Sequence, residues 1–315
     1  VELLISLLLG LFLTAGIVSV YLESKRNFAA DEELARIQEN GRFALGLLKR
    51  ELMLAGFFGG YLEFDELTTT PTLSGCASGW ALEIDTPLDF VDNFDSSLTG
   101  VSGDDLPCLD TTELVQGTDI VAIKRSAGEP TVYDGSWVGA TAPKDNQIYL
   151  QIEDYGDDKN WVRHTSGNFS PAPDPNDAVE YWETYAKIFF IRDHSVDPND
   201  AIPTLCVQEL VDNAMVERCL VEGVENMQLA FGVDTSAPDT VPDRYVADPN
   251  SFESVLTARL YLLMRSVAEL PGEVNISQKS FQLGLDPNAV QVNDGYLRRV
   301  FSTTVQVRNA ALPAD

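Results

Sequence analysis

An acidic residue lies at the front of the most apolar segment of the chain. Glu2 precedes twenty uncharged residues, Leu3 to Leu22, in the sequence VELLISLLLGLFLTAGIVSVYLE. An ionised carboxylate in hydrocarbon costs on the order of 2.5 kcal/mol or more, and a nearby cation offsets much of that cost. Glu2 therefore either pairs with a positive group or lies at the lipid headgroups or in water.

The cysteines predict covalent cross-links rather than a metal centre. The chain has no CxxC spacing and only two histidines, so it lacks the close Cys and His pairs of a structural zinc site. We expect two disulfides formed in an oxidising compartment, with free buried thiols as the alternative. The pairing that is local in sequence joins Cys76 to Cys108 and Cys206 to Cys219.

No catalytic motif accompanies the two histidines, His164 and His194. The sequence contains no GxSxG elbow for a nucleophilic serine and no GxGxxG or GxxxxGK[ST] loop for a nucleotide. We therefore expect that the protein is not an enzyme and that it binds no nucleotide.

Aspartates in turn-rich segments are the remaining candidates for ion binding. Carboxylate oxygens are ligands for calcium, but the most suggestive stretch, DTSAPDTVPDRY, lacks the central glycine and final glutamate of an EF-hand loop. We expect solvated turns and no cofactor, with calcium as the alternative. The aspartates in question are Asp104, Asp105, Asp157, Asp158, Asp234, Asp239 and Asp243.

The charge of the chain excludes polyanionic partners. The formal net charge is −28, and residues 1–60 hold seven acidic and six basic residues, which leaves 42 acidic and 15 basic residues downstream. Nucleic acids and anionic lipids need clustered Lys and Arg, so neither is an expected partner.

One continuous helix is expected at the N-terminus. At about 1.5 Å per residue, twenty apolar residues match the roughly 30 Å of a bilayer's hydrocarbon. A basic n-region and a small-residue cleavage site are both missing, so we expect the segment to be retained. Behind it, apolar residues recur at spacings of three and four up to the glycines at 56, 59 and 60, as in an amphipathic helix. These positions include Leu34, Ile37, Ala44, Leu47, Leu48 and Leu52.

A change to a period of two predicts a β-rich remainder. Segments rich in Val, Ile, Tyr and Phe alternate with loops dense in Asp, Pro and Gly. The expected organisation is a hydrophobic, membrane-spanning segment at 1–24, an amphipathic continuation at 25–58 and a single β-rich head at 59–315. The expected strands are WALEID from Trp80, DIVAIKR from Asp119, NQIYLQIE from Asn146, TYAKIFFIRD from Thr184, ENMQLAFGVD from Glu225, VLTARLYLLMRS from Val255 and RRVFSTTVQVRN from Arg298.

These features resemble type IV pilins. VELLISLLLG is similar to the start of a mature pilin after prepilin peptidase processing, and RIQENGRFALGLLKRELMLAGFFGG resembles the helix end of the PilW family of minor pilins. LVEGVENMQLAFGVD, DRYV and LRRVFSTTVQVRNA resemble the C-terminal strands of that family. The resemblance covers roughly residues 1–60 and 220–310, and residues 61–215 carry no motif that matches.

The resemblance implies an α+β pilin-like fold, with a long helix packed on a mainly antiparallel head. It implies an inner-membrane protein with its head outside the cytoplasm, which then joins a pilus through helix packing with other pilins. Glu2 matches the glutamate thought to meet the free amine of a neighbouring subunit. The expected function is a minor pilin of the initiating or tip complex. The alternatives are a self-polymerising main subunit, a type II secretion pseudopilin and a membrane-anchored adhesin or binding module whose ligand is unknown.

Overall fold

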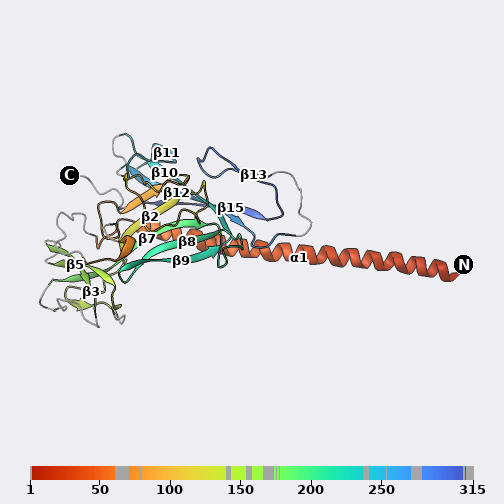
Figure 1. Ribbon diagram of the computed structural model, residues 1–315, viewed down its shortest axis with the longest axis horizontal. Helices are drawn as coiled ribbons and strands as arrows, with labels where there is room; N and C mark the ends of the chain where they lie inside the picture. The colour runs from red at the N-terminus through yellow and green to blue at the C-terminus, as the bar shows by residue number, and fades with distance from the viewer. Residues whose placement is uncertain are drawn as a thin grey trace.

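A single long helix leads into a β-rich head and projects far beyond it (Figure 1). The computed structural model describes residues 2–60, 71–77, 80–139, 143–153, 158–165, 174, 176, 178–236, 241–252, 254–270, 279–307 and 309. The α+β, pilin-like arrangement expected from the sequence is confirmed by this long helix and the large antiparallel sheet.

The helix α1 runs without interruption from Glu2 to Leu54. No proline occurs before Pro71, so no residue in this stretch removes a helical hydrogen bond. The helix ends in a tight turn, in which Phe57 N donates to Leu54 O at 3.0 Å. Gly56, inside this turn, has a φ of 74°. A positive φ at glycine is a usual way to stop a helix. The predicted continuous helix is confirmed.

The head contains one short 3-10 helix, η1 (Gly75–Ala77), and strands of very different lengths. The strands are β1 (Leu88–Val91), β2 (Ile120–Ser126), β3 (Val132–Tyr133), β4 (Ser136–Trp137), β5 (Ile148–Glu153), β6 (Asp158–Arg163), β7 (Glu180–Arg192), β8 (Thr204–Val211), β9 (Ala214–Glu222), β10 (Val224–Val233), β11 (Arg244–Val246), β12 (Val255–Arg265), β13 (Lys279–Phe281), β14 (Val290–Val292) and β15 (Arg298–Gln306).

Strand β7 organises the larger sheet. Its first residues pair with β3 and β5, and its last residues pair with β2 on one side and β8 on the other. The described strands around it form a nine-stranded sheet in which every pair is antiparallel. All seven residues of β2 are buried, because apolar clusters cover both faces of the sheet.

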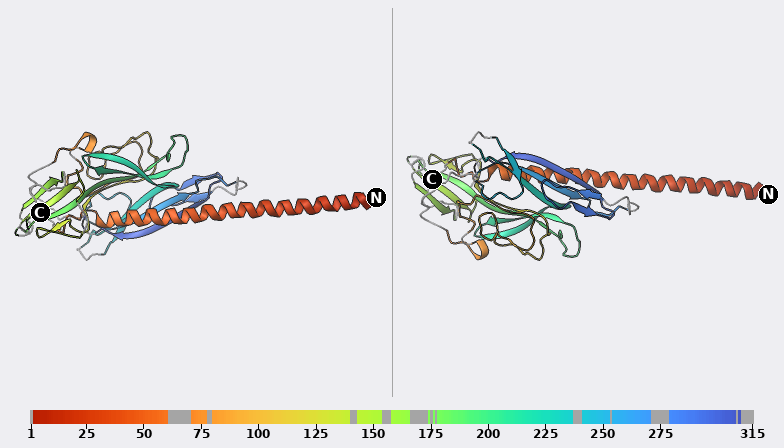
Figure 2. Two further views of the ribbon diagram at one scale, coloured as in Figure 1. Left: turned by 90° about the horizontal axis from the view of Figure 1, so that it is seen from below. Right: turned by 90° about the horizontal axis from the view of Figure 1, so that it is seen from above.

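A second sheet lies over the rear half of α1, in the order β11-β10-β12-β15. The main core is shared by α1, β10 and β12 with the inner face of the larger sheet. From α1 it takes one stripe at spacings of three and four, and Figure 2 shows this half of the helix lying along the head. The buried core residues of this stripe are Ile37, Ala44, Leu48 and Leu52, and Ala55 continues it just beyond the end of the helix.

Asp119 ties the two sheets together. Its backbone N–H donates to Met227 O at 2.9 Å, and its carboxylate accepts the N–H of Leu229 at 2.6 Å, both in β10. The residue is fully buried, and this burial raises its pKa well above the ordinary value for an aspartate. Backbone donors thus satisfy a polar group that apolar surroundings would otherwise penalise.

Six of the seven expected strand segments overlap strands of the structure, and the segment at residues 80–85 does not. Trp80, Leu82 and Ile84 are buried in the second apolar cluster, but the backbone there turns, with Glu83 N donating to Trp80 O at 3.2 Å. The strand prediction for this segment is wrong. Apolar and polar residues alternate along it as they would in a strand, but here a turn places the apolar side chains in the core. Strands β8 and β9 were not predicted.

Two glycines of α1 make a matched test of how closely the helix approaches β15. A Cβ at Gly41 would lie 2.7 Å from the ring of Phe301, whereas a Cβ at Gly46 would meet nothing within 4 Å. Alanine adds up to about 1 kcal/mol of helix propensity at either position. Gly46→Ala should therefore raise the free energy of unfolding of the full chain in detergent. The free energy of unfolding of Gly41→Ala should be about 1–3 kcal/mol lower than that of Gly46→Ala, because the Phe301 ring must shift to make room for the new methyl group. Equal effects in denaturant titrations followed by tryptophan fluorescence would show that the contact is not tight.

Candidate assembly interface

The apolar run at the front of α1, Leu3 to Leu22, is exposed on every side among the described residues. All residues from Glu2 to Phe28 are exposed, and Leu3 and Phe12 are 75% and 66% exposed. Among the described residues, α1 is the helix that is long and apolar enough to cross a membrane. Figure 1 shows this run as a free rod that carries the N-terminus away from the head. Such a surface needs lipid or other apolar helices around it.

Glu2 is the charged residue at the front of the apolar run, Leu3 to Leu22. Ser6 Oγ donates to Leu3 O at 3.0 Å and Thr14 Oγ1 donates to Gly10 O at 2.8 Å, so the helix itself satisfies these hydroxyls. Glu2 lies in the first turn, where the helix dipole favours an acid, and has no partner among the described residues. Its carboxylate is available to a cation of another chain.

A buried ion-pair network fixes the other end of α1 to the head. The Glu51 carboxylate accepts three hydrogen bonds, from Arg125 Nε at 2.6 Å, from Arg125 Nη2 at 2.9 Å and from Lys187 Nζ at 3.0 Å. The side chains of Glu51 and Arg125 are 7% and 3% exposed. Burial acts to raise the pKa of Glu51, but the hydrogen bonds and charges of Arg125 and Lys187 outweigh burial and hold it below the ordinary value. Sequence reasoning missed this network, although an acid on the buried stripe of an amphipathic helix is a readable signal.

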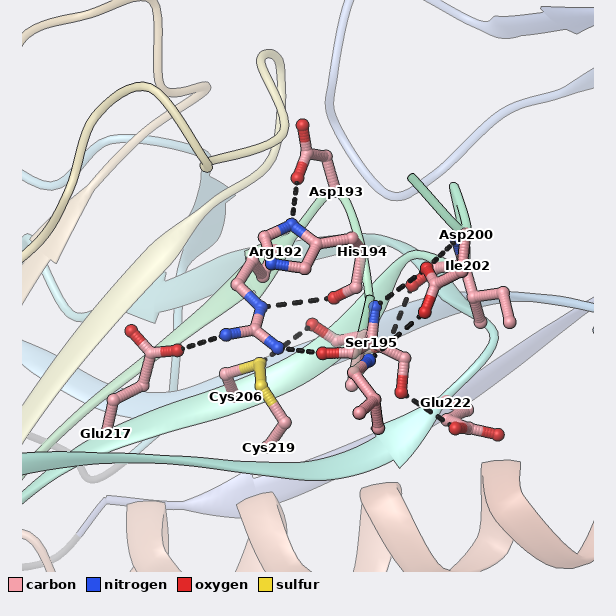
Figure 3. The surroundings of a disulfide bond; sticks show 12 residues. Arg192, Asp193, His194, Ser195, Asp200, Ile202, Cys206, Glu217, Cys219 and Glu222 are labelled. Atoms are coloured by element: carbon pink, nitrogen blue, oxygen red, sulfur yellow. Dashed lines mark hydrogen bonds and ion pairs between the residues drawn. A yellow bond between two sulfur atoms is a disulfide. The ribbon is translucent and has the colours of Figure 1, made fainter. Parts of the chain in front are cut away.

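Both disulfides lie in the head, away from the rod. Cys76 in η1 is bonded to Cys108, and Cys206 in β8 is bonded to Cys219 in β9. Figure 3 shows the second bond beside Arg192, whose Nη1 contacts Glu217 Oε1 at 2.5 Å. Closing short loops in this way limits the unfolded chain more than the folded one. The two bonds stabilise the head on which α1 is mounted.

The residues around this disulfide form structural contacts rather than a catalytic triad. His194 Nδ1 lies 2.7 Å from Asp193 Oδ1, but the hydroxyl of the adjacent Ser195 donates to Glu222 at 2.7 Å (Figure 3). Asp200 accepts the backbone N–H of Ile202 and Ser195, and these bonds lower its pKa to about 2. His164 is buried elsewhere, with its ring 6.4 Å from that of Tyr149.

Three of the candidate calcium ligands serve as turn acceptors, and Asp104 accepts the N–H of Gly100 through its backbone oxygen at 2.8 Å. Asp243 Oδ2 accepts the N–H of Thr235 at 2.8 Å, and Asp234 Oδ1 accepts that of Ser236 at 3.2 Å. Asp105 accepts the Thr99 hydroxyl at 2.6 Å. Asp239, Asp157 and the side chain of Asp158 lie outside the described residues. Within the described residues, the metal-ligand types that lie close together are Cys206, Glu217 and Cys219, and their two sulfurs are already bonded.

The chain matches one family of known proteins over its C-terminal part. Residues 188–309 match the model of the family PilW, described as Type IV Pilus-assembly protein W. The matched range begins inside β7 and includes β8 to β15, but not α1. No curated protein and no solved structure matches the chain. The match supports membership in the PilW family.

Replacing Glu51 by glutamine tests whether the ion-pair network holds α1 to the head. Glu51→Gln should lower the free energy of unfolding by about 3 kcal/mol or more, because Arg125 keeps its buried charge without a counter-charge. Since the pKa of Glu51 is lowered by folding, its contribution is present above the unfolded value of about 4.5 and is lost as pH falls through the folded value. Denaturant titrations at pH 7 and along an acid series measure both effects.

Glu39→Gln is the matched control, because Glu39 is an exposed acid on the same helix. It should change the free energy of unfolding by no more than about 0.5 kcal/mol. It should also keep the acid dependence of the unsubstituted chain, which Glu51→Gln should flatten. If both variants behave alike, the network does not anchor the helix.

Proposed function

We propose that this chain, as a member of the PilW family, is a minor pilin that takes part in the initiation or tip complex of a type IV pilus. Involvement in pilus assembly follows from the family match over residues 188–309. The minor role and the position in the fibre are the further steps of the proposal. The chain acts as a structural subunit, without catalysis and without a cofactor.

The observation that carries the proposal is the exposed apolar rod of α1. Each large apolar side chain is worth about 1.5–3 kcal/mol when buried rather than left in water. A rod with fourteen exposed large apolar side chains between Leu3 and Leu22 is therefore not stable in water alone. Before assembly a bilayer can surround it, with the disulfide-bearing head outside the cytoplasm. In a fibre the helices of other pilins take the place of the lipid.

Glu2 gives the packed rods a defined stagger. Its carboxylate has no partner among the described residues and would lie in apolar surroundings once the rod is covered. Pairing with the free amine of a neighbouring subunit neutralises it at one axial offset only. Two of the hydroxyls of the rod, those of Ser6 and Thr14, bond to their own helix and impose no offset.

The size of the head supports a position at the tip. The β-rich part of the chain extends from residue 88 to residue 306, and a bulky head is difficult to repeat along a thin fibre. We therefore expect one or a few copies in each pilus. Quantification of this chain against the main subunit in sheared pili measures the ratio. Many copies in a helical array would show that the chain is a main filament subunit instead.

Substitution of Glu2 tests the assembly role directly. Glu2→Ala should lower the share of the chain recovered in sheared pili about tenfold or more, while the membrane pool stays constant. A tenfold change corresponds to about 1.4 kcal/mol, a reasonable loss for an ion pair in apolar surroundings. Immunoblots of the sheared and membrane fractions measure the partition.

Glu23→Gln provides the control for the Glu2 experiment. Glu23 is also an exposed acid of α1, but it lies behind the apolar run. Incorporation of this variant should equal that of the unsubstituted chain. If Glu2→Ala also enters pili normally, the proposed pairing is wrong. If the unsubstituted chain stays in the membrane throughout, it is an anchored module and not a pilin.

A further inference from the structure

A cationic groove lies beside the rear half of α1 on a strongly acidic chain. It has a volume of about 510 Å³ and is bounded by α1 on one side and by β2 and β7 on the other. Four of its lining residues are basic and one is acidic, in a chain with a net charge of −28. The lining residues are Arg42, Phe43, Gly46, Leu47, Arg50, Glu51, Arg125, Tyr185 and Lys187.

The acid in the groove is already neutralised by the groove's own floor. Glu51 takes hydrogen bonds from Arg125 and Lys187, as described above. The Tyr185 ring lies beneath the same cations, 4.5 Å from Arg125 Cζ and 5.3 Å from Lys187 Nζ. Burial raises the pKa of the Tyr185 phenol, so the ring adds no negative charge. The floor therefore has an excess of positive charge, held rigidly in place.

Two further cations stand at the rim without a counter-charge. Arg42 and Arg50 are exposed, and neither has an ion-pair partner among the described residues. By contrast, the exposed Arg36 on the same helix lies 3.6 Å from Glu33. These two arginines thus carry no counter-charge from the described part of a strongly acidic chain. Positive potential gathered in a groove attracts an anionic partner.

The rim also offers an apolar contact. The side chain of Phe43 is 57% exposed although it lies next to Arg42, and Leu47 is only partly buried. An exposed aromatic residue beside arginines is a typical composition for a protein-binding site. A free phosphate or other small anion would leave this apolar part uncovered, whereas a peptide segment would use both.

We propose that this groove docks an acidic segment from a different pilus subunit. The proposal rests on the function proposed above and adds the chemistry of the partner. Arg42 and Arg50 are eight residues apart, which is about 12 Å along a helix. An extended segment advances about 3.3 Å per residue, so carboxylates at its first and fifth positions span the same distance. An apolar side chain at the third position then faces the same side, about 6.6 Å along the segment, and lies level with Leu47, which is about 7.5 Å beyond Arg42 along the helix.

Geometry and charge argue against two other occupants of the groove, lipid headgroups and a second copy of this chain. Arg42 lies twenty residues beyond Leu22, about 30 Å along the helix from the end of the apolar segment, so lipid headgroups next to that segment do not reach it. A second copy of this chain would bring together two bodies of net charge −28, which repel one another. A subunit that is less acidic overall, with a local acidic segment, avoids this repulsion.

Peptide binding to the full chain in neutral detergent micelles tests the proposal. The probe is a fluorescently labelled peptide with the core Glu-Ser-Leu-Ser-Glu, followed by anisotropy. Arg42→Glu and Arg50→Glu should each weaken binding about tenfold or more, and rising salt should weaken it further. Lys49→Glu makes the same charge change at the neighbouring exposed position, which does not line the groove, and should change affinity less than twofold. A peptide with both glutamates replaced by lysine should not bind.

Each contrary result identifies a specific failure. Equal weakening by Arg50→Glu and Lys49→Glu would show that only the overall charge matters. Displacement of the probe by inorganic phosphate, or by phosphatidylglycerol vesicles at matched charge, would replace the protein partner with a general anion or a lipid. Concentration-dependent dimers that Arg50→Glu abolishes would identify a second copy as the occupant. Unchanged tryptophan fluorescence and circular dichroism confirm that each variant is folded.

The two proposals fail separately. If the probe does not bind but the chain enters pili with its normal dependence on Glu2, the docking site is wrong and the minor pilin function stands. If the chain never enters pili, the proposed function fails whatever the peptide does, and binding of the probe then describes only an acidic-peptide site.

Discussion

One continuous helix has to satisfy two different surroundings, and the rest of the structure depends on this constraint. The front of α1 is apolar all round and exposed, whereas from Glu33 onward a single stripe is buried against the head. Because no break separates the two parts, the axis of the head is tied to the axis of the rod. Whatever surrounds the rod, lipid or other helices, therefore also sets the direction in which the head points.

The head holds the helix by shape in the middle and by charge at the end. At Gly41 the absence of a side chain lets the ring of Phe301 in β15 approach the helix backbone. At Glu51 the carboxylate is bound by Arg125 from β2 and Lys187 from β7. The first contact belongs to the four-stranded sheet and the second to the nine-stranded sheet, and Asp119 connects the two sheets. A pull on the rod is thus shared between both sheets rather than carried by one strand.

The sequence alone predicted the helix and most of the long strands, because these depend on periodicity within one segment. Ile37, Ala44, Leu48 and Leu52 repeat at helical spacing and are buried in the structure. The errors occurred where segments far apart in the chain decide the outcome. The WALEID segment turns because it packs into a distant apolar cluster, and the pairing of Glu51 with Arg125 joins residues 74 apart. Periodicity carries no information about which distant residue will meet a buried acid.

The candidate site was accessible to sequence reasoning only in part, for the same reason. Glu2 and the apolar run are local features and could be read directly. The cationic groove could not, because Arg42 and Arg50 come from α1 while Arg125 and Lys187 come from strands that are remote in sequence. The net charge predicts an acidic surface rather than a cationic groove, since the chain as a whole is strongly acidic. Local charge depends on the fold, whereas net charge depends on composition.

The family match covers the strands that hold the helix and leaves out the lining residues of the groove that we propose as a docking site. The matched residues, 188–309, include β12 and β15, the strands against which the helix packs, as well as the disulfide between β8 and β9. The groove residues Arg125, Tyr185 and Lys187 lie outside that range, as does the whole of α1. A docking groove must differ between proteins of one family if each of them is to meet its own neighbour, whereas the strands that hold the helix need not differ. The position of the groove, at the border between the helix and the unmatched strands, is where such a difference can arise without disturbing the fold.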